Sequence, residues 1–262
     1  MFYIQKKYVM TKFIRNLFLS LFVVYVFSAC DMFKIDNYES PNATIRGGII
    51  DAVTKELVET DMVNGSFLRF EELGENWAVG GFLDRVVMQN GEYQDKMFFA
   101  GEYSLEFLNC NFYPHKYDKI TINKGDNVRD FEVTPYIRVK NVNIRKEGNE
   151  IVATFNLQAG KPEVRLSNIR IYYSTDIYAG EGFTRFPLGG TSFQQTFNPV
   201  IAIDESVTYR LTIDLTNTTN KTNFRYKRNY YFRVGAIASV SGVGVVRRNY
   251  APYTIINFNV TQ

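Results

Sequence analysis

The stretch Ile151-Val-Ala-Thr-Phe-Asn-Leu157 places an apolar residue at every second position, and Tyr209-Arg-Leu-Thr-Ile-Asp-Leu215 repeats the pattern. A period of two puts the apolar side chains on one face of a β-strand and the polar side chains on the other. We therefore expect one face of each strand to be buried and the other to meet water. Both stretches predict strands of a sheet that covers a hydrophobic core.

Similar short runs fill the chain from Ala43 onward. They are rich in Val, Ile, Phe and Tyr and are separated by Gly, Asn and Pro, while no stretch keeps a 3.6-residue apolar period. This pattern predicts an all-β chain. In the first half it predicts strands at residues 43–51, 66–71, 85–88, 92–97, 101–107, 118–122 and 128–133. Asn90-Gly91 favours a two-residue hairpin between the third and fourth strands, because both residues tolerate positive φ angles.

A proline marks the expected boundary between two domains. It stands at Thr134-Pro135, where it interrupts the strand pattern. Beyond it, apolar residues alternate again from Phe232 to Ala238. Tyr230, just before them, is expected to place its hydroxyl at a sheet-to-sheet corner, as in sandwich folds. The sequence therefore predicts two consecutive β-sandwich domains, residues 42–134 and 135–262.

The N-terminal residues have the three parts of a bacterial lipoprotein signal. Four basic residues and no acidic one precede a mostly apolar run at residues 17–29. A spanning helix needs roughly 18 or more apolar residues, whereas a secretory signal needs about 7 to 15. The small pair Ser28-Ala29 suits cleavage before Cys30, whose thiol would carry the lipid. We expect a lipoprotein signal peptide at residues 1–29, a tether at residues 30–41 and lipidation of Cys30; the alternative is an uncleaved anchor helix.

The formal charge of +3 belongs to this signal. Cleavage before Cys30 removes four basic residues and leaves 26 Lys and Arg against 27 Asp and Glu. The mature chain is then nearly neutral, so its charge does not point to a nucleic acid partner. Lipidation of Cys30 would also leave Cys110 without an intramolecular partner, so the fold must be held by its core.

Several runs resemble known families. Three runs in the first half resemble the carboxypeptidase regulatory-like, transthyretin-like β-sandwich: Ala43-Thr-Ile-Arg-Gly-Gly-Ile-Ile-Asp51, Gln89-Asn-Gly-Glu-Tyr93 and Ala100-Gly-Glu-Tyr-Ser-Leu105. In the second half, Asn229-Tyr-Tyr-Phe-Arg-Val-Gly-Ala236 is similar to a fibronectin type III or immunoglobulin-like module. The whole order resembles a lipoprotein family of unknown function from Bacteroidetes. That resemblance implies a polysaccharide utilisation locus, an outer-membrane transporter and a glycan-capturing lipoprotein as neighbours.

The residues that carry enzyme chemistry are sparse. His115 is the only histidine, which excludes a multi-histidine zinc site and an HExxH helix. Cys110 lies five residues earlier, but nothing in the sequence indicates a lowered thiol pKa. The chain has no phosphate-binding glycine loop, and its paired carboxylates fall at expected strand ends or loops. We therefore predict no enzyme activity, no bound metal and no cofactor, with His115 as a surface loop residue.

Aromatic residues outside the alternating runs are the remaining candidates for binding. Trp77 lies in a glycine-rich, charged segment, and residues 176–199 form an expected 24-residue loop with several aromatic residues among glycines. Such a loop is either a packed flap with a short extra strand near 183–187 or an exposed recognition loop. Aromatic rings suit the apolar face of a sugar, and they also anchor protein partners. The candidate ligand-binding residues are Trp77, Tyr178, Phe183, Arg185 and Phe186.

These observations favour a non-enzymatic lipoprotein that is anchored to the outer membrane through Cys30. We expect it to lie at the cell surface, with the periplasmic face as the alternative. Its expected role is accessory binding of a polysaccharide or oligosaccharide in an uptake system. The other reading is a structural or interaction module that docks on an outer-membrane transporter complex or acts as an adhesin-like spacer.

Overall fold

A computed structural model describes residues 40–74, 81–183 and 187–258. From Pro41 onward, the described residues form one compact unit. Almost all regular structure in the described part is β, which confirms the predicted all-β fold. The described residues include no helix long and apolar enough to cross a bilayer. The division at Thr134-Pro135 into two domains stays a prediction.

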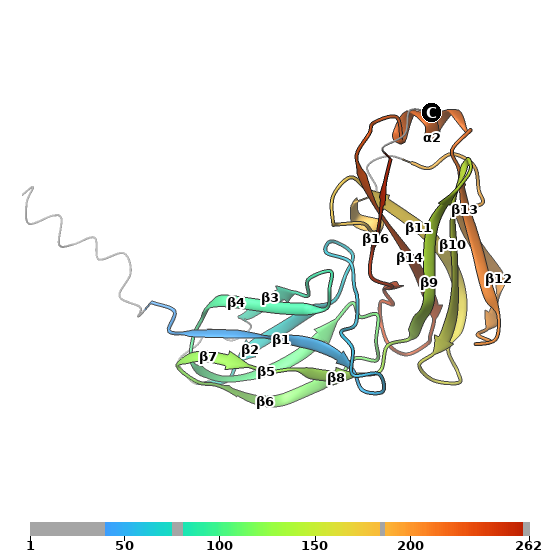
Figure 1. The fold of residues 1–262 in the computed structure, drawn as a ribbon. Coiled ribbons are helices and arrows are strands. Elements are labelled where there is room, and N and C mark those ends of the chain that lie inside the picture. Colours follow the sequence, from blue (N-terminus) through green and yellow to red (C-terminus); the bar gives the residue numbers. More distant parts are fainter. Residues whose placement is uncertain (1–39, 75–80, 184–186, 259–262) are drawn as a thin grey trace, which may run out of the picture. The chain divides into compact units, whose positions relative to one another are not determined.

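The first half of the unit consists of two sheets packed face to face. One has the order β4 (Glu92–Phe98), β1 (Ala43–Asp51), β7 (Gly125–Val128), and β8 (Phe131–Val133) also pairs with β1. The other has the order β3 (Phe82–Val86), β2 (Phe67–Glu72), β5 (Gly101–Leu108), β6 (Lys116–Ile122) (Figure 1). Ring contacts between the sheets include Phe70 with Phe98 at 5.1 Å and Phe107 with Phe131 at 5.3 Å between centroids.

Two expectations for this half need correction. The predicted strand 128–133 is split into β7 and β8. Asp130 lies between them, and its side chain accepts a hydrogen bond from the Gly48 amide of β1. The Asn90-Gly91 turn does form, with Gly91 at φ 86° and the Met88 amide bonded to the Glu92 carbonyl. It does not join paired strands, since β3 pairs with β2 and β4 pairs with β1. The turn residues fix local geometry, and the hydrophobic faces assign the flanking strands to different sheets.

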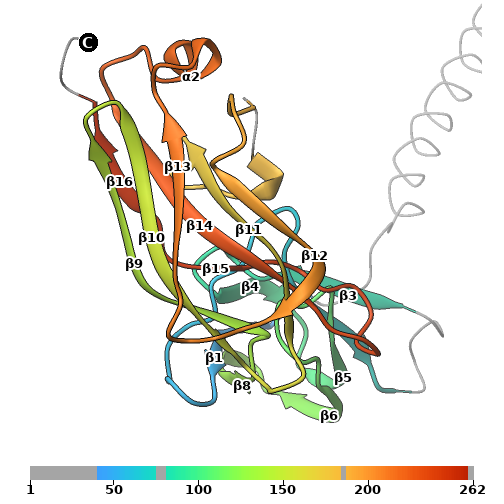
Figure 2. The ribbon, with the colours of Figure 1, turned by 90° about the vertical axis from the view of Figure 1, so that its right-hand side faces the viewer.

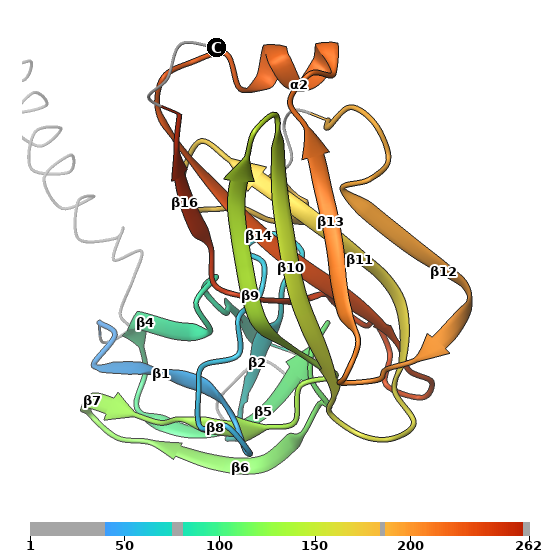
Figure 3. The ribbon, with the colours of Figure 1, turned by 45° about the vertical axis from the view of Figure 1, so that its right-hand side comes forward.

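The second half contains two further sheets. β13 (Thr208–Asp214), β10 (Glu150–Ala159) and β9 (Ile137–Glu147) lie side by side (Figure 3). The other sheet has the order β12 (Gln194–Ala202), β11 (Arg165–Ser174), β14 (Asn229–Ser239), β15 (Asn249–Tyr250), with β16 (Thr254–Asn257) also on β14 (Figure 2). Two short helices, η2 (Glu181–Phe183) and α2 (Thr218–Asn223), lie in connections.

The core of this half follows the alternation in the sequence. Ile151, Ala153, Phe155 and Leu157 are completely buried, as predicted. Val152 on the opposite face is also buried, between Arg145 and Thr212 of the neighbouring strands, so that face is wet only in part. The hydroxyl of Tyr230 lies 3.3 Å from the carbonyl oxygens of Asn223 and Tyr226, which confirms the predicted corner.

Candidate functional site

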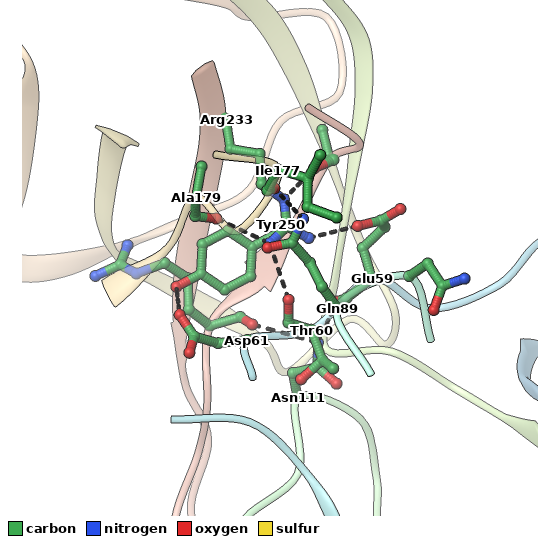
Figure 4. Close-up of polar contacts among 12 residues, drawn as sticks. Glu59, Thr60, Asp61, Gln89, Asn111, Ile177, Ala179, Arg233 and Tyr250 are labelled. Atoms are coloured by element: carbon green, nitrogen blue, oxygen red, sulfur yellow. Dashed lines mark hydrogen bonds and ion pairs between the residues drawn. The ribbon is translucent and has the colours of Figure 1, made fainter. Parts of the chain in front are cut away.

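A buried arginine on β14 connects segments from both halves of the unit. The side chain of Arg233 is completely buried, although it is charged, and its neighbours along the strand are apolar. Its Nε donates to the Ala251 carbonyl at 2.8 Å, and its Nη1 donates to the carbonyls of Thr60 at 2.9 Å and Ala179 at 3.1 Å. Its Nη2 pairs with Glu59 Oε2 at 2.5 Å (Figure 4). One guanidinium therefore holds together three segments that are distant in the sequence.

Asp61 makes a second set of contacts beside Arg233. Its Oδ1 accepts hydrogen bonds from the amides of Val63 at 2.8 Å and Asn64 at 3.0 Å. Its Oδ2 accepts one from the amide of Gly182 and one from the hydroxyl of Tyr250, both at 3.2 Å. Figure 4 shows Asp61 and Tyr250 next to each other in this network. Asp61 thus fixes its own turn and the loop that carries η2.

Two glycines allow this loop to approach so closely. A Cβ added to Gly180 would lie 2.2 Å from Asp61 Oδ2, and one added to Gly182 would lie 2.3 Å from the Cβ of Val63. Neither distance is possible for packed atoms, so any larger residue at these positions would push the loop away. The glycines of this loop therefore serve close packing against Asp61.

The loop predicted at residues 176–199 is shorter in the structure, because β12 begins at Gln194. Ala179, Leu188 and Phe193 are buried, which favours the packed flap over a fully exposed loop. Gln89 also holds the flap, since its Nε2 donates to the Ile177 carbonyl at 2.8 Å. The predicted strand near 183–187 is not seen at Phe183, which belongs to η2, and 184–186 lie outside the described residues.

Two predicted binding residues meet at the surface of this flap. The rings of Tyr178 and Phe183 are stacked, with centroids 5.5 Å apart and planes 25° apart. Tyr178 is 37% exposed and Phe183 is half-buried. Because the rings cover one another, they form one small aromatic platform. Trp77, Arg185, Phe186 and the predicted lipid site Cys30 lie outside the described residues, so their roles stay predictions.

A pocket of about 380 Å³ lies between β1, the turn that follows β1, β9 and the segment from β15 to Pro252. Its apolar lining comes from Leu57, Val58, Pro135, Ile137, Val139, Tyr250 and Pro252. Its polar lining comes from Asp51, Thr54, Glu56, Glu59, Asn90, Arg138, Lys140 and Asn249. We call it the β1/β9 pocket. Its size and its mixture of apolar wall and separate polar groups are typical of small-molecule sites, which measure about 300–1,000 Å³.

The charges in the β1/β9 pocket are held in defined positions. Arg138 binds both oxygens of Asp51, with Nε at 2.5 Å from Oδ2 and Nη2 at 2.8 Å from Oδ1. Burial alone would raise the pKa of Asp51, but hydrogen bonds from Arg138 and the Val53 amide outweigh it and hold the pKa below its usual range. Burial raises the pKa of Glu59, although Arg233 opposes this shift.

Carboxylates in a common pocket raise the question of glycoside hydrolysis, which needs two free acids. Here the guanidinium of Arg138 occupies both oxygens of Asp51, so this carboxylate is not positioned to attack or to activate water. Glu59 is paired with Arg233. The arrangement suits hydrogen bonding to a polar ligand better than acid-base chemistry.

Neither residue considered for nucleophilic chemistry lies in this pocket. Cys110 is buried, and burial raises the pKa of its thiol to about 12. The thiol is therefore protonated at neutral pH and is a poor nucleophile. His115 is exposed, as predicted, with its ring against Tyr117 at 4.6 Å between centroids.

No sequence motif marks the residues that build this site. They are Asp51, Glu59, Asp61, Arg138 and Arg233. Arg233 alone had a readable signal, because it is a charged residue within the apolar run from Tyr230 to Ala236. The others lie in ordinary strand ends and turns, and only the three-dimensional pairing brings them together.

Comparisons with known proteins place this chain in a family. The sequence model of a domain of unknown function, DUF3823_C, matches residues 137–253. A crystal structure from Bacteroides uniformis ATCC 8492 is 43% identical, with a TM-score of 0.78, and the match covers 83% of this chain and all of the other. The chain belongs to the DUF3823 family. That relative from B. uniformis is described as a candidate carbohydrate binding protein.

More distant DUF3823 structures share the fold. One from Parabacteroides merdae ATCC 43184 is 19% identical with a TM-score of 0.65, covering 84% of this chain and all of the other. One from Bacteroides ovatus ATCC 8483 is 22% identical with a TM-score of 0.62, covering 82% of this chain and 98% of the other. None of the curated proteins is similar to this chain.

Proposed function

We propose that this DUF3823 protein is a non-enzymatic accessory glycan-binding protein of a polysaccharide uptake system. In this proposal it is anchored to the outer membrane by a lipid on Cys30 and faces the cell surface. The observation that carries the binding role is the β1/β9 pocket, with its apolar wall and its fixed charges. The description of the B. uniformis relative as a candidate carbohydrate binding protein supports the same ligand class.

The pocket offers what a sugar requires. A pyranose presents an apolar C-H face and a rim of hydroxyls that both donate and accept hydrogen bonds. Leu57, Pro135 and Tyr250 supply apolar surface for the first. Glu56 and Glu59 supply acceptors and Lys140 supplies donors for the second. Such a ligand would be held by many modest contacts, with the Asp51 and Arg138 pair as a rigid wall.

The stacked pair of Tyr178 and Phe183 serves as a secondary platform in this proposal. A longer glycan that extends beyond the pocket would need a further accessible aromatic face. Tyr178 is 37% exposed and offers such a face. Tyr178→Ala is therefore expected to weaken a polysaccharide more than a disaccharide. Equal effects on both ligands would remove the platform from the proposal.

Affinity electrophoresis of the full chain in gels that contain neutral polysaccharides tests the proposal. We expect retardation by at least one polysaccharide and about a tenfold loss of affinity in the double variant Glu56→Ala/Lys140→Ala, because each change removes a charged hydrogen-bonding group. Both side chains are exposed, so the fold should persist. Lys146→Ala, also on β9 but outside the pocket, is the matched control. Unchanged retardation in the double variant would contradict the pocket as the site.

Hydrolysis is tested in the same samples. If the protein only binds, chromatography of the incubated polysaccharide shows no shorter products. Product release that is lost in Glu59→Gln would overturn the non-enzymatic part of the proposal.

The second candidate function is docking on an outer-membrane transporter complex. It is favoured by exposed apolar side chains on and near the edge strand β3, with Phe82 at 55% and Val86 at 44% exposure. Crosslinking in intact membranes that joins β3 to a transporter component, without any glycan retention, would favour docking over glycan binding.

A further inference from the structure

Two arginines lie close to the ring of Tyr172 on β11. The Cζ of Arg170 is 5.0 Å from the centre of the Tyr172 ring, and the Cζ of Arg248 is 5.5 Å from it. Tyr172 is 1% exposed, and its ring also contacts that of Tyr250 at 5.6 Å between centroids. Arg170 and Tyr172 are two positions apart on β11, so they share one face of the sheet.

Three polar atoms in this cluster are buried without a hydrogen-bond partner. They are Tyr172 Oη, Arg170 Nε and Arg248 Nε. A buried donor without a partner costs about 1–3 kcal/mol, and more when it is charged. Three such atoms around one ring are therefore a costly arrangement unless another molecule completes their hydrogen bonds.

The positive charge in the cluster is only partly balanced. Glu181 Oε1 lies 4.0 Å from Arg248 Nη2, and its side chain is 41% exposed. Asp61, the other carboxylate that acts on Tyr172, already accepts hydrogen bonds from Gly182 and Tyr250. Within the described residues, the side chain of Arg170 has no hydrogen bond and no ion pair, and its guanidinium lies against the rings of Tyr172 and Phe193. The cluster has an excess of donors and of positive charge.

One neighbouring side chain extends this donor set, and a second orients it. Gln194 of β12 stands opposite Arg170 in the strand register and is exposed. Asn168, one step along β11 on the same face, already orients Arg248 by accepting from its Nη1 at 2.9 Å. Guanidinium groups bind planar or tetrahedral anions through paired N-H donors, and a tyrosine hydroxyl can add a third bond.

We propose that Arg170, Tyr172 and Arg248 form a binding site for an anionic oxygen group, a carboxylate or a sulfate ester, carried by an acidic glycan. The anion site stands on its own contacts and is separate from the β1/β9 pocket. Only the statement that a glycan carries the anion rests on the proposed function. An acidic polysaccharide would then be held at two places, by its sugar ring and by its charge.

Titration of the full chain, purified in detergent, with sodium sulfate and with sodium glucuronate tests the anion site. Ionic strength is held constant with sodium chloride, and glucose serves as the uncharged probe. We expect saturable binding of sulfate, glucuronate or both, weakened about tenfold in Arg170→Gln, because one charge-assisted donor set is lost. Binding of sulfate alone points to a sulfate ester, and binding of glucuronate alone points to a uronic acid.

Two further variants separate binding from structure. Tyr172→Phe removes only the unpartnered hydroxyl and is expected to keep the fold while lowering anion affinity. Arg46→Gln is the matched control, because Arg46 is exposed and paired with Asp126 at 2.9 Å on strands of the first half. Equal anion affinity in wild type, Arg170→Gln and Tyr172→Phe, or no saturable anion binding, would overturn the inference.

The outcome is separable from that of the glycan proposal. The double variant Glu56→Ala/Lys140→Ala should bind sulfate or glucuronate like the wild type. Arg170→Gln should bind neutral oligosaccharides like the wild type. If anion binding falls in the pocket variant and persists in Arg170→Gln, the anion lies in the β1/β9 pocket and the proposed anion site is wrong.

Discussion

Glu59 and Arg233 are separated by 174 positions in the sequence and form an ion pair of 2.5 Å with a completely buried guanidinium. Burial lowers the pKa of Arg233, while Glu59 opposes that shift. Hydrogen bonds from Arg233 to three backbone carbonyls satisfy most of its remaining donors. The pair therefore connects the turn before β2 with β14 at the edge of the β1/β9 pocket.

Replacing Arg233 should destabilise the fold strongly. Arg233→Met leaves Glu59 unpaired and three carbonyls without their donor, so we expect a loss of about 3–5 kcal/mol in the free energy of unfolding. Urea denaturation of wild type and variant measures the difference. Glu59→Gln keeps a hydrogen-bonding group and should lose less. A smaller loss in Arg233→Met than in Glu59→Gln would contradict this account of the network.

Replacing Asp61 should release the flap. In Asp61→Asn one carboxylate oxygen becomes an NH₂ donor, which meets donors on Val63 and Asn64 or on Gly182 and Tyr250. We expect a loss of about 1–3 kcal/mol and faster hydrogen exchange at residues 177–183. Asp126→Asn, at an exposed pair with Arg46, is the control and should leave this segment unchanged. Equal exchange in wild type and Asp61→Asn would show that other contacts hold the flap.

The strands of this fold are readable in the sequence, whereas their partners are not. The alternation from Ile151 to Leu157 predicts β10 and its buried face, because a period of two is a local property. Asn90-Gly91 predicts a turn correctly and strand pairing wrongly, because pairing depends on which sheet needs each hydrophobic face. The network around Arg233 depends on contacts between distant segments, which no local pattern encodes. The glycines of the flap indicate an unusual loop, but the sequence does not show that they are needed for close packing against Asp61.

The ion pair of Asp51 and Arg138 should make the free energy of unfolding depend on pH in the acidic range. The folded state holds the pKa of Asp51 below its usual value of about 3.9, so its contribution is present above that value and is lost as pH falls through the folded pKa. We expect Asp51→Asn to be less stable than wild type at pH 7, because it leaves the Arg138 charge unpaired, with a difference that shrinks toward pH 2. Denaturation between pH 2 and pH 7 measures it. A difference that does not change with pH would contradict the pairing.

The lipid anchor is tested at one residue. Cys30→Ser removes the thiol that would carry the lipid, so the variant should leave the membrane fraction or keep its signal peptide unprocessed. Membrane fractionation and intact mass measure both outcomes, and Cys110→Ser is the control with the other cysteine. Unchanged fractionation and mass in Cys30→Ser would refute lipidation.

A crystal structure with a retained oligosaccharide would show whether the β1/β9 pocket binds a glycan. We expect sugar density in the pocket, with a hydroxyl within hydrogen-bond distance of Glu59 or Lys140 and a ring face on Leu57, Pro135 or Tyr250. Sugar density confined to another surface, with the pocket free of ligand, would contradict it.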